Sequence, residues 1–404
     1  MFKFTPLVAA MLVASAPVLA ANNSSEQNQI GIDNVAEVLQ SGGSGNFAEQ
    51  NQGGFSNDAA IEQLSSFGST AEQNQFGNFN DADAQQSFAV DSTSTQNQRG
   101  WDNTATVTQN GTLHTTITQT QNGSYNSADT SQSAAFHSDA STNQLGDLNE
   151  ASITQVASSF DKATIDQDGD NNDARITQLL SSGSIAEVEQ VGVGNDAQVA
   201  QTGLNQEAYV YSNGIGNNVD VDQDGNAQNA FVLQYGVAND SRIEQTNGWM
   251  GGNNTATTEQ FGTGNSADVF QDGRNQTAKT TQVGAFNSAA VDQQGRGNEL
   301  YFGQNGTGNE LTAVQDGTDN QIVGLSVGFG NSVDVAQDGR DNLAGIQQNG
   351  VANEASLTQT GAAHLASVNQ TGWDNSAVAT QSGYGNAAYI NQNGWNNSAT
   401  VTQN

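Results

Sequence analysis

Residues 359–403 read QTGAAHLASVNQTGWDNSAVATQSGYGNAAYINQNGWNNSATVTQ. Glutamine returns at every eleventh position of this stretch, and glycine follows each of the first four glutamines after two residues. Alanine follows the same four glutamines after seven residues. A period this regular indicates a repeat architecture, in which each unit buries its inner face only against its neighbours. The recurring glutamines, called anchor glutamines below, are Gln359, Gln370, Gln381, Gln392 and Gln403.

The same pattern extends backwards through the chain to Gln29. From Gln29 to Gln190 the spacing between anchor positions alternates between eleven and twelve, so the unit has 23 residues. From residue 190 to residue 404 the spacing is eleven and the unit has 22 residues, apart from a loop insertion at residues 246–253. No linker or change of composition interrupts the pattern, and we expect residues 21–404 to form a single repeat domain.

Each half-unit has the pattern of a strand followed by a tight arc. Before the anchor, inward and outward residues alternate, as in SATVTQ at residues 398–403, which is the period of a strand. After the anchor come turn formers such as NGWNN at residues 393–397, and the glycine suits a positive φ. Stacked units of this kind predict an all-β fold. It is a cross-β-like, two-sheet parallel β-solenoid of strand, arc, strand units of 22–23 residues, with turns about 4.8 Å apart.

Stacking in register places each anchor glutamine above the next one. Side-chain amides aligned in this way form hydrogen-bonded ladders along the stack. Asparagine, which follows most anchors after five residues, is expected to cap the turn or to form a second ladder. The residues assigned to these structural ladders are Gln75, Gln190, Gln201, Gln293, Gln304, Gln359, Gln370, Gln381, Gln392, Gln403, Asn375, Asn386 and Asn397.

The core between the two sheets is expected to be thin. Alanine occupies most of the inward positions seven residues after an anchor, and it buries little apolar area. Hydrogen bonds along the stack are therefore expected to supply much of the stability. The widest core is expected where larger residues replace alanine, at Leu300, Leu311, Ile322 and Val333.

The chain is strongly acidic, with 42 Asp and Glu against 9 Lys and Arg and a formal net charge of −33. This charge repels nucleic acids and anionic membranes, so we expect neither as a partner. The sequence has no cysteine, which excludes disulfides and thiolate metal sites. Both prolines, Pro6 and Pro17, lie within the first 20 residues, so no proline interrupts the strands that follow.

Residues 1–20, MFKFTPLVAAMLVASAPVLA, combine a basic start, an apolar run and small residues before Ala20. These features predict a signal peptide that is removed on export. No later segment has the roughly 20 consecutive apolar residues that a membrane-spanning helix needs. We therefore expect an exported chain without a membrane span.

The repeat resembles that of the curlin family, the subunits of curli amyloid fibres of Gram-negative bacteria. The family pattern is Ser, five residues, Gln-x-Gly-x-Gly-Asn-x-Ala, three residues and Gln. Its second glycine is often replaced here, and the chain has more units than the handful typical of the family. The pattern is carried by Ser69, Gln75, Gly77, Asn80, Ala82 and Gln86, and by Ser184, Gln190, Gly192, Gly194, Asn195, Ala197 and Gln201.

The resemblance implies a structural subunit that assembles with itself into amyloid fibres. Such a subunit is exported through the periplasm and forms a cell-surface fimbrium, or pilus, for adhesion and biofilm matrix. A nucleator subunit and outer-membrane export machinery are the further partners implied. Since no basic residue follows Arg340, the chain is more similar to a major subunit than to a nucleator. The regular last unit is expected to template the next subunit.

Two alternatives stay open at this point. One is a solitary extracellular β-solenoid that acts as an adhesin or ice-binding protein through outward threonines such as Thr104, Thr106 and Thr108. The other is a polysaccharide-active enzyme. However, the sequence has no recognisable catalytic set, so we predict no enzyme, no catalytic residue and no cofactor.

Aspartate recurs directly after several anchors, beside the glycine of the arc. Calcium binding is one interpretation, but the nonapeptide GGxGxDxUx of calcium-binding β-rolls is absent, and we predict no metal site. The preferred interpretation is a charge that discourages premature pairing of strands, a gatekeeper role that the resemblance also implies. The gatekeeper candidates are Asp168, Asp224, Asp272, Asp316 and Asp338.

Tryptophan and histidine give no functional signal of their own. The tryptophans are expected to be isolated, exposed residues in or beside arcs, and the histidines to lie far apart without metal-ligand spacing. These residues are Trp101, Trp249, Trp373, Trp395, His114, His137 and His364.

Overall fold

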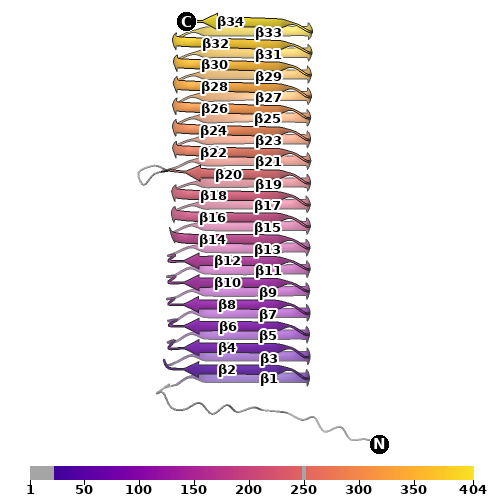
Figure 1. Cartoon of the computed structure of the whole chain (residues 1–404). Coiled ribbons are helices and arrows are strands. Elements are labelled where there is room, and N and C mark those ends of the chain that lie inside the picture. Colours follow the sequence, from indigo (N-terminus) through magenta and orange to yellow (C-terminus); the bar gives the residue numbers. More distant parts are fainter. Residues whose placement is uncertain (1–21, 248–251) are drawn as a thin grey trace, which may run out of the picture.

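The computed structural model describes residues 22–247 and 252–404. Over these residues the chain forms 34 strands and no helix, and the strands wind into a straight rod (Figure 1). Odd-numbered strands lie in one sheet, the odd sheet, and even-numbered strands in the other, the even sheet. The predicted signal peptide at residues 1–20 and part of the predicted insertion, residues 248–251, lie outside the described residues.

The odd sheet contains the strand that opens each turn. Its members are β1 (Ser24–Ile32), β3 (Phe47–Phe55), β5 (Thr70–Asn78), β7 (Thr93–Trp101), β9 (Thr116–Ser124), β11 (Asp139–Asp147), β13 (Lys162–Asp170), β15 (Ile185–Val193), β17 (Glu207–Ile215), β19 (Asn229–Val237), β21 (Thr255–Thr263), β23 (Thr277–Ala285), β25 (Glu299–Thr307), β27 (Gln321–Phe329), β29 (Leu343–Val351), β31 (Leu365–Trp373) and β33 (Ala387–Trp395).

The even sheet contains the strand that closes each turn. Its members are β2 (Val35–Ser41), β4 (Asp58–Leu64), β6 (Asp81–Ser87), β8 (Thr104–Asn110), β10 (Ser127–Ser133), β12 (Glu150–Val156), β14 (Asp173–Ser182), β16 (Asp196–Leu204), β18 (Asn218–Asn226), β20 (Asp240–Thr246), β22 (Ser266–Arg274), β24 (Ser288–Arg296), β26 (Glu310–Thr318), β28 (Ser332–Arg340), β30 (Glu354–Ala362), β32 (Ser376–Tyr384) and β34 (Ser398–Gln403).

Strands pair in parallel with the strand one turn further along the chain, and the register joins equivalent positions of the repeat. Gln167 lies beside Gln190, 23 residues on, and Gln201 lies beside Gln223, 22 residues on. Across the insertion the same register is kept with a step of 26 residues. The two-sheet parallel β-solenoid predicted from the sequence is therefore confirmed.

Columns of small inward-facing side chains fill the space between the sheets. Alanine four residues before the anchor is fully buried in turns as far apart as those of Ala48, Ala186 and Ala366. The four larger residues that replace it are also buried, at Leu300, Leu311, Ile322 and Val333.

The aromatic ring of Phe302 is accommodated by a glycine in the adjacent turn. Phe302 faces the core and is buried, and Gly324 lies beside it in the next strand of the odd sheet. A Cβ atom built on Gly324 would collide with the Phe302 ring. One large and one small side chain therefore share the core space of two turns.

Glycine two residues after the anchor is required for two reasons. The glycines at this position in the odd sheet, from Gly31 to Gly394, have φ between +115° and +143°, which confirms the positive φ predicted from the sequence. The second reason is a close approach between turns. At Gly328 a Cβ atom would occupy the place of the carbonyl oxygen of Gly350 in the next turn. No side chain fits there while the turns stay in register.

Two residues later, the arc passes through the left-handed helical region. Gly330 has φ +64°, but the equivalent positions in other turns hold Leu148 (φ +60°), Phe286 (φ +55°) and Ala352 (φ +54°). A side chain in this conformation costs roughly 1–2 kcal/mol. The chain therefore tolerates local backbone strain here, because no neighbouring atom lies within 4 Å of a Cβ added at Gly330.

Gly328 and Gly330 provide a matched pair for testing these two requirements. Gly330→Ala should lower the free energy of unfolding by about 1 kcal/mol, since it adds only backbone strain. Gly328→Ala should lower it by at least about 3 kcal/mol, since a new atom must push two turns apart. Thermal and urea unfolding of the monomer, followed by circular dichroism, would measure both. Equal losses would contradict the role assigned to the carbonyl of Gly350.

Candidate functional site

The anchor glutamines of the even sheet form one continuous ladder. Each Nε2 donates to the Oε1 one turn further on, over 2.7–3.2 Å, without a break from Gln40 to Gln403. Between the first and last turns the ladder side chains are almost completely buried. Of the predicted ladder residues, this column contains Gln201, Gln293, Gln359, Gln381 and Gln403.

The anchor ladder of the odd sheet has two interruptions. It runs from Gln29 to Gln190, where Ser212 takes the next position, and again from Gln234 to Gln304, where Ser326 follows. The Oγ of Ser326 donates to Gln348 Oε1 (2.9 Å), and the ladder then continues to the last turn. Of the predicted ladder residues, this column contains Gln75, Gln190, Gln304, Gln370 and Gln392.

Anchor glutamines also join the two sheets. Gln75 Nε2 donates to the carbonyl oxygen of Asp58 (2.6 Å), which opens a strand of the even sheet. At the end of the chain, Gln403 donates to the carbonyl of Ala387 (3.0 Å) in the odd sheet. One amide group therefore links neighbouring turns and opposite sheets at the same time.

An asparagine ladder follows the arc that leads from the odd to the even sheet. Asn397 donates through its backbone N–H (3.2 Å) and its Nδ2 (2.8 Å) to Oδ1 of Asn375, one turn earlier. Asn386 lies in the opposite arc, so it does not join this ladder. There its backbone N–H donates to Nδ1 of the buried His364 (3.2 Å), which takes the position of an asparagine.

A third glutamine ladder, which the sequence analysis does not single out, runs inside the first turns of the odd sheet. Its members stand two residues before the anchors and form hydrogen bonds of 2.8–3.1 Å from one turn to the next. All but the first are completely buried. The available signal was a second glutamine in register with the anchor, at Gln27, Gln50, Gln73, Gln96 and Gln119.

A buried carboxylate, Asp161, takes the place of a serine in the arc from the even to the odd sheet. Its oxygens accept hydrogen bonds from Ser181 Oγ (2.6 Å) and from the backbone N–H of Ser184 (2.8 Å). Burial raises the pKa of Asp161, although these hydrogen bonds act in the opposite direction. The folded chain therefore holds a proton at this carboxyl more readily than an exposed aspartate would.

The gatekeeper candidates all lie exposed on the outer surface, but only two are neighbours. Asp316 and Asp338 lie side by side in adjacent turns of the even sheet. Asp224 lies between two threonines, Thr202 and Thr246. The two remaining candidates have no aspartate beside them either: Asp272 pairs with Thr246 and Gln294, and Asp168 with Leu145 and Val191.

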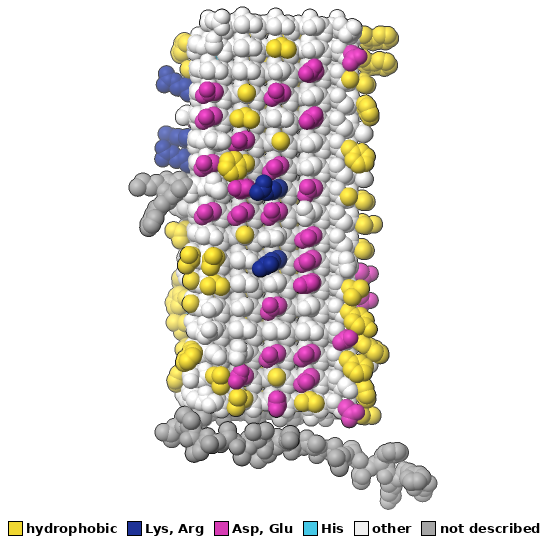
Figure 2. All heavy atoms as spheres, viewed as in Figure 1, with side chains coloured by type: hydrophobic (Ala, Val, Ile, Leu, Met, Phe, Trp, Pro, Cys, Tyr) yellow, Lys and Arg dark blue, Asp and Glu magenta, His cyan; other side chains and the backbone are white. Residues whose placement is uncertain are grey.

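The outer face of the even sheet carries many carboxylates, whereas its last turns carry few (Figure 2). Burial and neighbouring carboxylates raise the pKa of Asp81, Asp196 and Asp222 on this face. Thr104, Thr106 and Thr108 also face outwards, but the threonine row does not continue. Their partners in β6 are Asp81, Asp83 and Gln85, and their partners in β10 are Ser127, Asp129 and Ser131.

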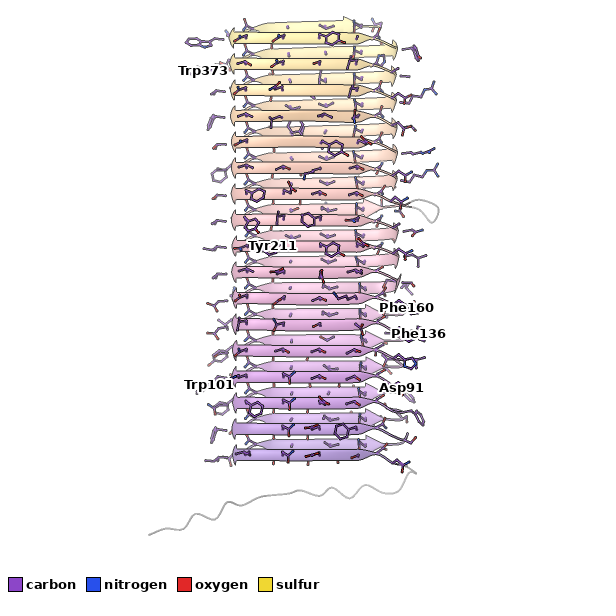
Figure 3. The ribbon with its side chains drawn as sticks, turned by 180° about the vertical axis from the view of Figure 1, so that it is seen from behind. Asp91, Trp101, Phe136, Phe160, Tyr211 and Trp373 are labelled. Carbon is purple, nitrogen blue, oxygen red and sulfur yellow. The ribbon has the colours of Figure 1, made fainter. Side chains whose placement is uncertain are left out.

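Aromatic side chains line both edges of the rod (Figure 3). Trp373 and Trp395 are stacked with ring centroids 5.3 Å apart, and Trp101 packs on Phe79 at 5.5 Å. The expectation of isolated tryptophans is therefore wrong for these three, because equivalent positions of successive turns lie side by side. Trp249 lies outside the described residues.

The histidines also differ from the expectation. The rings of His114 and His137 are stacked 4.8 Å apart, since 23 residues separate equivalent positions of neighbouring turns. His364 lies apart from them and is buried. Across the described residues, no group of three or more His, Asp or Glu side chains is arranged to hold a metal ion.

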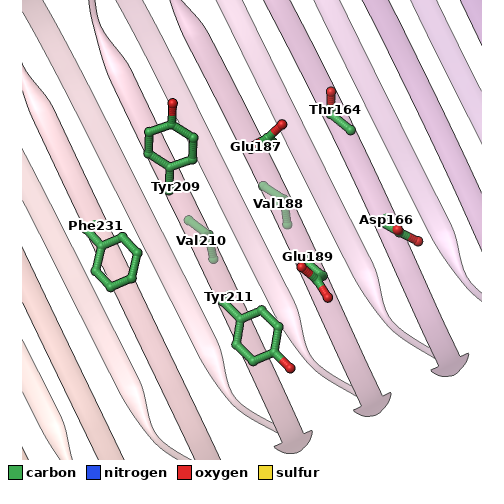
Figure 4. Close-up of a pocket in the computed structure, with 9 residues that line it drawn as sticks. All are labelled: Thr164, Asp166, Glu187, Val188, Glu189, Tyr209, Val210, Tyr211 and Phe231. Atoms are coloured by element: carbon green, nitrogen blue, oxygen red, sulfur yellow. The ribbon is translucent and has the colours of Figure 1, made fainter.

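A shallow groove of about 320 Å³ crosses the outer face of the odd sheet (Figure 4). Carboxylates line one part of it and aromatic rings the other. Burial, followed by repulsion from Asp166 and Glu187, raises the pKa of Glu189. The lining residues are Thr164, Asp166, Glu187, Val188, Glu189, Tyr209, Val210, Tyr211 and Phe231.

The two end turns present complementary groups. Within the described residues, β1 and β2 pair on one side only, and so do β33 and β34. At the first turn, Oε1 of Gln29 and Oε1 of Gln40 accept no hydrogen bond from a described residue. At the last turn, Nε2 of Gln392 and Nε2 of Gln403 donate only to backbone carbonyls. The glutamine ladders thus begin with acceptors and end with donors.

Comparison with known proteins gives a family. The sequence model described as the curlin associated repeat matches five segments, residues 137–179, 214–246, 251–284, 339–372 and 373–404. No curated protein matches the chain. Among the described residues, no helix is long and apolar enough to cross a membrane. The matched segments, which together cover just under half of the chain, contain parts of the anchor ladders and of the arcs described above, and their repeats are those of the curlin repeat family.

Proposed function

We propose that the chain is a secreted structural subunit that assembles with itself, head to tail, into curli-type amyloid fibres at the cell surface. The fibres would serve adhesion and biofilm matrix. The observation that carries this proposal is the complementarity of the two end turns. The curlin repeats support it, and so does the signal peptide predicted from residues 1–20.

If the last turn of one copy stacks on the first turn of another in the register of the rod, equivalent positions meet. Gln392 would donate to Gln29, and Gln403 to Gln40, which continues both anchor ladders. Gly394 would meet Gly31, so the close approach between arcs is kept. The remaining equivalent pairs are Asn397 with Asn34, Ala399 with Ala36 and Val401 with Val38.

Such a joint brings together two different surfaces, the last turn of one copy and the first turn of the next. A contact of this kind does not close on itself, so repeated addition gives an open filament rather than a ring. The strands remain perpendicular to the filament axis and continue the parallel pairing of the rod, which is the cross-β arrangement.

Charge favours contact at the ends over contact between the faces. The faces carry most of the 42 acidic residues, and two such faces repel each other. After Glu354 the only acidic residue is Asp374, so the last turn adds little repulsion to the joint. We assign a gatekeeper role to the exposed Asp168, Asp224, Asp272, Asp316 and Asp338 on the same reasoning.

Export through the periplasm, a nucleator subunit and outer-membrane export machinery belong to the same proposal. They follow from the curlin family and the predicted signal peptide.

The first test is assembly itself. The chain without residues 1–20, purified in denaturant and then diluted, should form fibres that bind thioflavin and give cross-β reflections near 4.7–4.8 Å and about 10 Å. Electron microscopy and fibre diffraction would measure this. A chain that stays monomeric for days at micromolar concentration would rule the proposal out.

The second test concerns the end turn. Gln392→Ala together with Gln403→Ala should slow seeded elongation by roughly tenfold or more, because both ladder donors of the joint are lost. The control is Gln282→Ala with Gln293→Ala, which changes the same ladders inside the rod and leaves both end turns intact. Equal slowing by the two double variants would show that the end turn has no special part in growth.

The third test is pH. Because the pKa values of Asp161, Asp81, Asp196 and Asp222 are raised in the folded chain, it binds protons more readily than the unfolded chain does. Folding stability should therefore increase as the pH falls through these raised values towards about 3.9, the usual pKa of aspartate. The melting temperature should rise between pH 7 and about pH 4.5. The variant Asp161→Ser should show a smaller rise in melting temperature. A melting temperature of the unchanged chain that falls on acidification would contradict the raised pKa values of these carboxyl groups.

A further inference from the structure

The two end turns match everywhere along the anchor ladders but differ at two inward positions of the odd sheet, and one of these places an amide against an aliphatic side chain. This position, two residues before the anchor, holds Gln27 in the first turn and Ile390 in the last. Within the rod, the change from amide to aliphatic side chains occurs between Gln119 and Ile165. The first and last turns therefore have different cores at this position.

The amides of the third glutamine ladder all point the same way. Nε2 of Gln27 donates to Oε1 of Gln50 (2.8 Å), and Nε2 of Gln50 donates to Oε1 of Gln73 (2.9 Å). Each Oε1 thus accepts from the preceding turn. Gln27 has no preceding turn among the described residues, and its side chain is exposed at the end of the rod. Water can satisfy its Oε1 there as long as the end is free.

The opposite end of this ladder is satisfied inside the chain. Nε2 of Gln119, the last member, donates to Oγ1 of Thr130 (3.0 Å) and to the carbonyl oxygen of Thr106 (2.9 Å). A surplus donor finds acceptors in the core because backbone carbonyls and hydroxyl groups accept more than one hydrogen bond. A surplus acceptor has no such choice, since the backbone N–H groups around it are committed to the sheets.

In the proposed head-to-tail joint, Gln27 of one copy is covered by Ile390 of the next. Isoleucine offers no donor, so burial strips water from Oε1 of Gln27 without replacing its hydrogen bond. A buried acceptor without a partner is costly. The inward Ser25 does not add a similar defect peculiar to the joint. Ser94 occupies the equivalent place inside the rod, and its buried hydroxyl is also without a partner.

We propose that the contact between Gln27 and Ile390 weakens the joint between copies. Buried amide oxygens without a partner also occur inside the rod, at Gln206 and Gln276, but there the adjacent turns belong to one covalent chain. Fibres then exchange subunits more readily than fibres with a matched joint would. By the same chemistry, the first turn binds a strand with glutamine at this position more tightly than it binds another copy of the chain. This inference rests on the proposed function and specifies the strength of the same joint.

Two single variants and their combination test the inference. Gln27→Ile removes the acceptor, and Ile390→Gln supplies a donor to it. Each should lower the concentration of soluble chain in equilibrium with fibres by roughly tenfold, measured at a urea concentration where soluble chain is detectable. In the double variant, the new donor of Ile390→Gln faces the isoleucine of Gln27→Ile and has no acceptor to gain across the joint. Its soluble concentration should therefore be no lower than that of Gln27→Ile alone.

A matched control separates the joint from the stability of the rod. Gln50→Ile makes the same change one turn inside the chain, where it breaks two hydrogen bonds of the ladder. It should lower the melting temperature of the monomer and leave the soluble concentration no lower than that of the unchanged chain. Circular dichroism of each monomer shows whether the variant folds, and Ile390→Gln tests the joint from the other end if Gln27→Ile does not.

The outcomes distinguish the two proposals. If none of the chains forms fibres, the proposed function fails. If fibres form and neither single variant lowers the soluble concentration, the joint does not bring Gln27 and Ile390 together, and this inference is overturned. Lower values for both single variants, with no further lowering in the double variant, would support it.

Discussion

The structure depends on buried amide groups that are satisfied by their own copies one turn away. An isolated glutamine in the core would leave polar atoms without partners, at a cost of a few kcal/mol. In this rod the neighbouring turn supplies the missing partner, because the parallel register aligns equivalent positions. The register in turn requires glycine in each arc of the odd sheet, where one carbonyl occupies the place of a side chain. Repetition of the sequence is therefore a condition of the fold.

Hydrogen bonding takes over part of the role that apolar burial has in globular proteins. Alanine fills much of the core and contributes little transfer free energy. Each buried amide hydrogen bond contributes about 1 kcal/mol net, and the ladders repeat it in nearly every turn. The serine at position 326 shows how a gap is tolerated. Its hydroxyl still donates to Gln348, and Gln304 keeps the hydrogen bond to the carbonyl of Ser288 (2.8 Å), of the kind that Gln282 makes to Ser266.

The sequence predicts the fold well because each strand pairs with the equivalent strand of the next repeat. The spacing within one repeat therefore also determines the pairing between repeats. The spacing of the anchors gives the strands, the arcs and the register together, and the positive φ of the arc glycines follows from residue type. Other features depend on distances between turns and could not be predicted from one repeat. The carbonyl of Gly350 at Gly328 is one, and the stacked rings of His114 and His137 are another. The ladder through Gln50 depends on a second glutamine in register with the anchor, which the spacing of the anchors alone does not predict.

The glutamine and asparagine ladders run in opposite directions, and this has an electrostatic consequence. Glutamine Nε2 groups donate to the glutamine one turn towards the C-terminal end of the rod, as from Gln359 to Gln381. In the arc ladder, asparagine Nδ2 groups donate to the asparagine one turn towards the N-terminal end, as from Asn397 to Asn375. Aligned amide dipoles of one direction would sum with length, as they do in a helix. Opposed rows of dipoles largely cancel each other instead. A rod built in this way can lengthen without accumulating partial charge at its two ends.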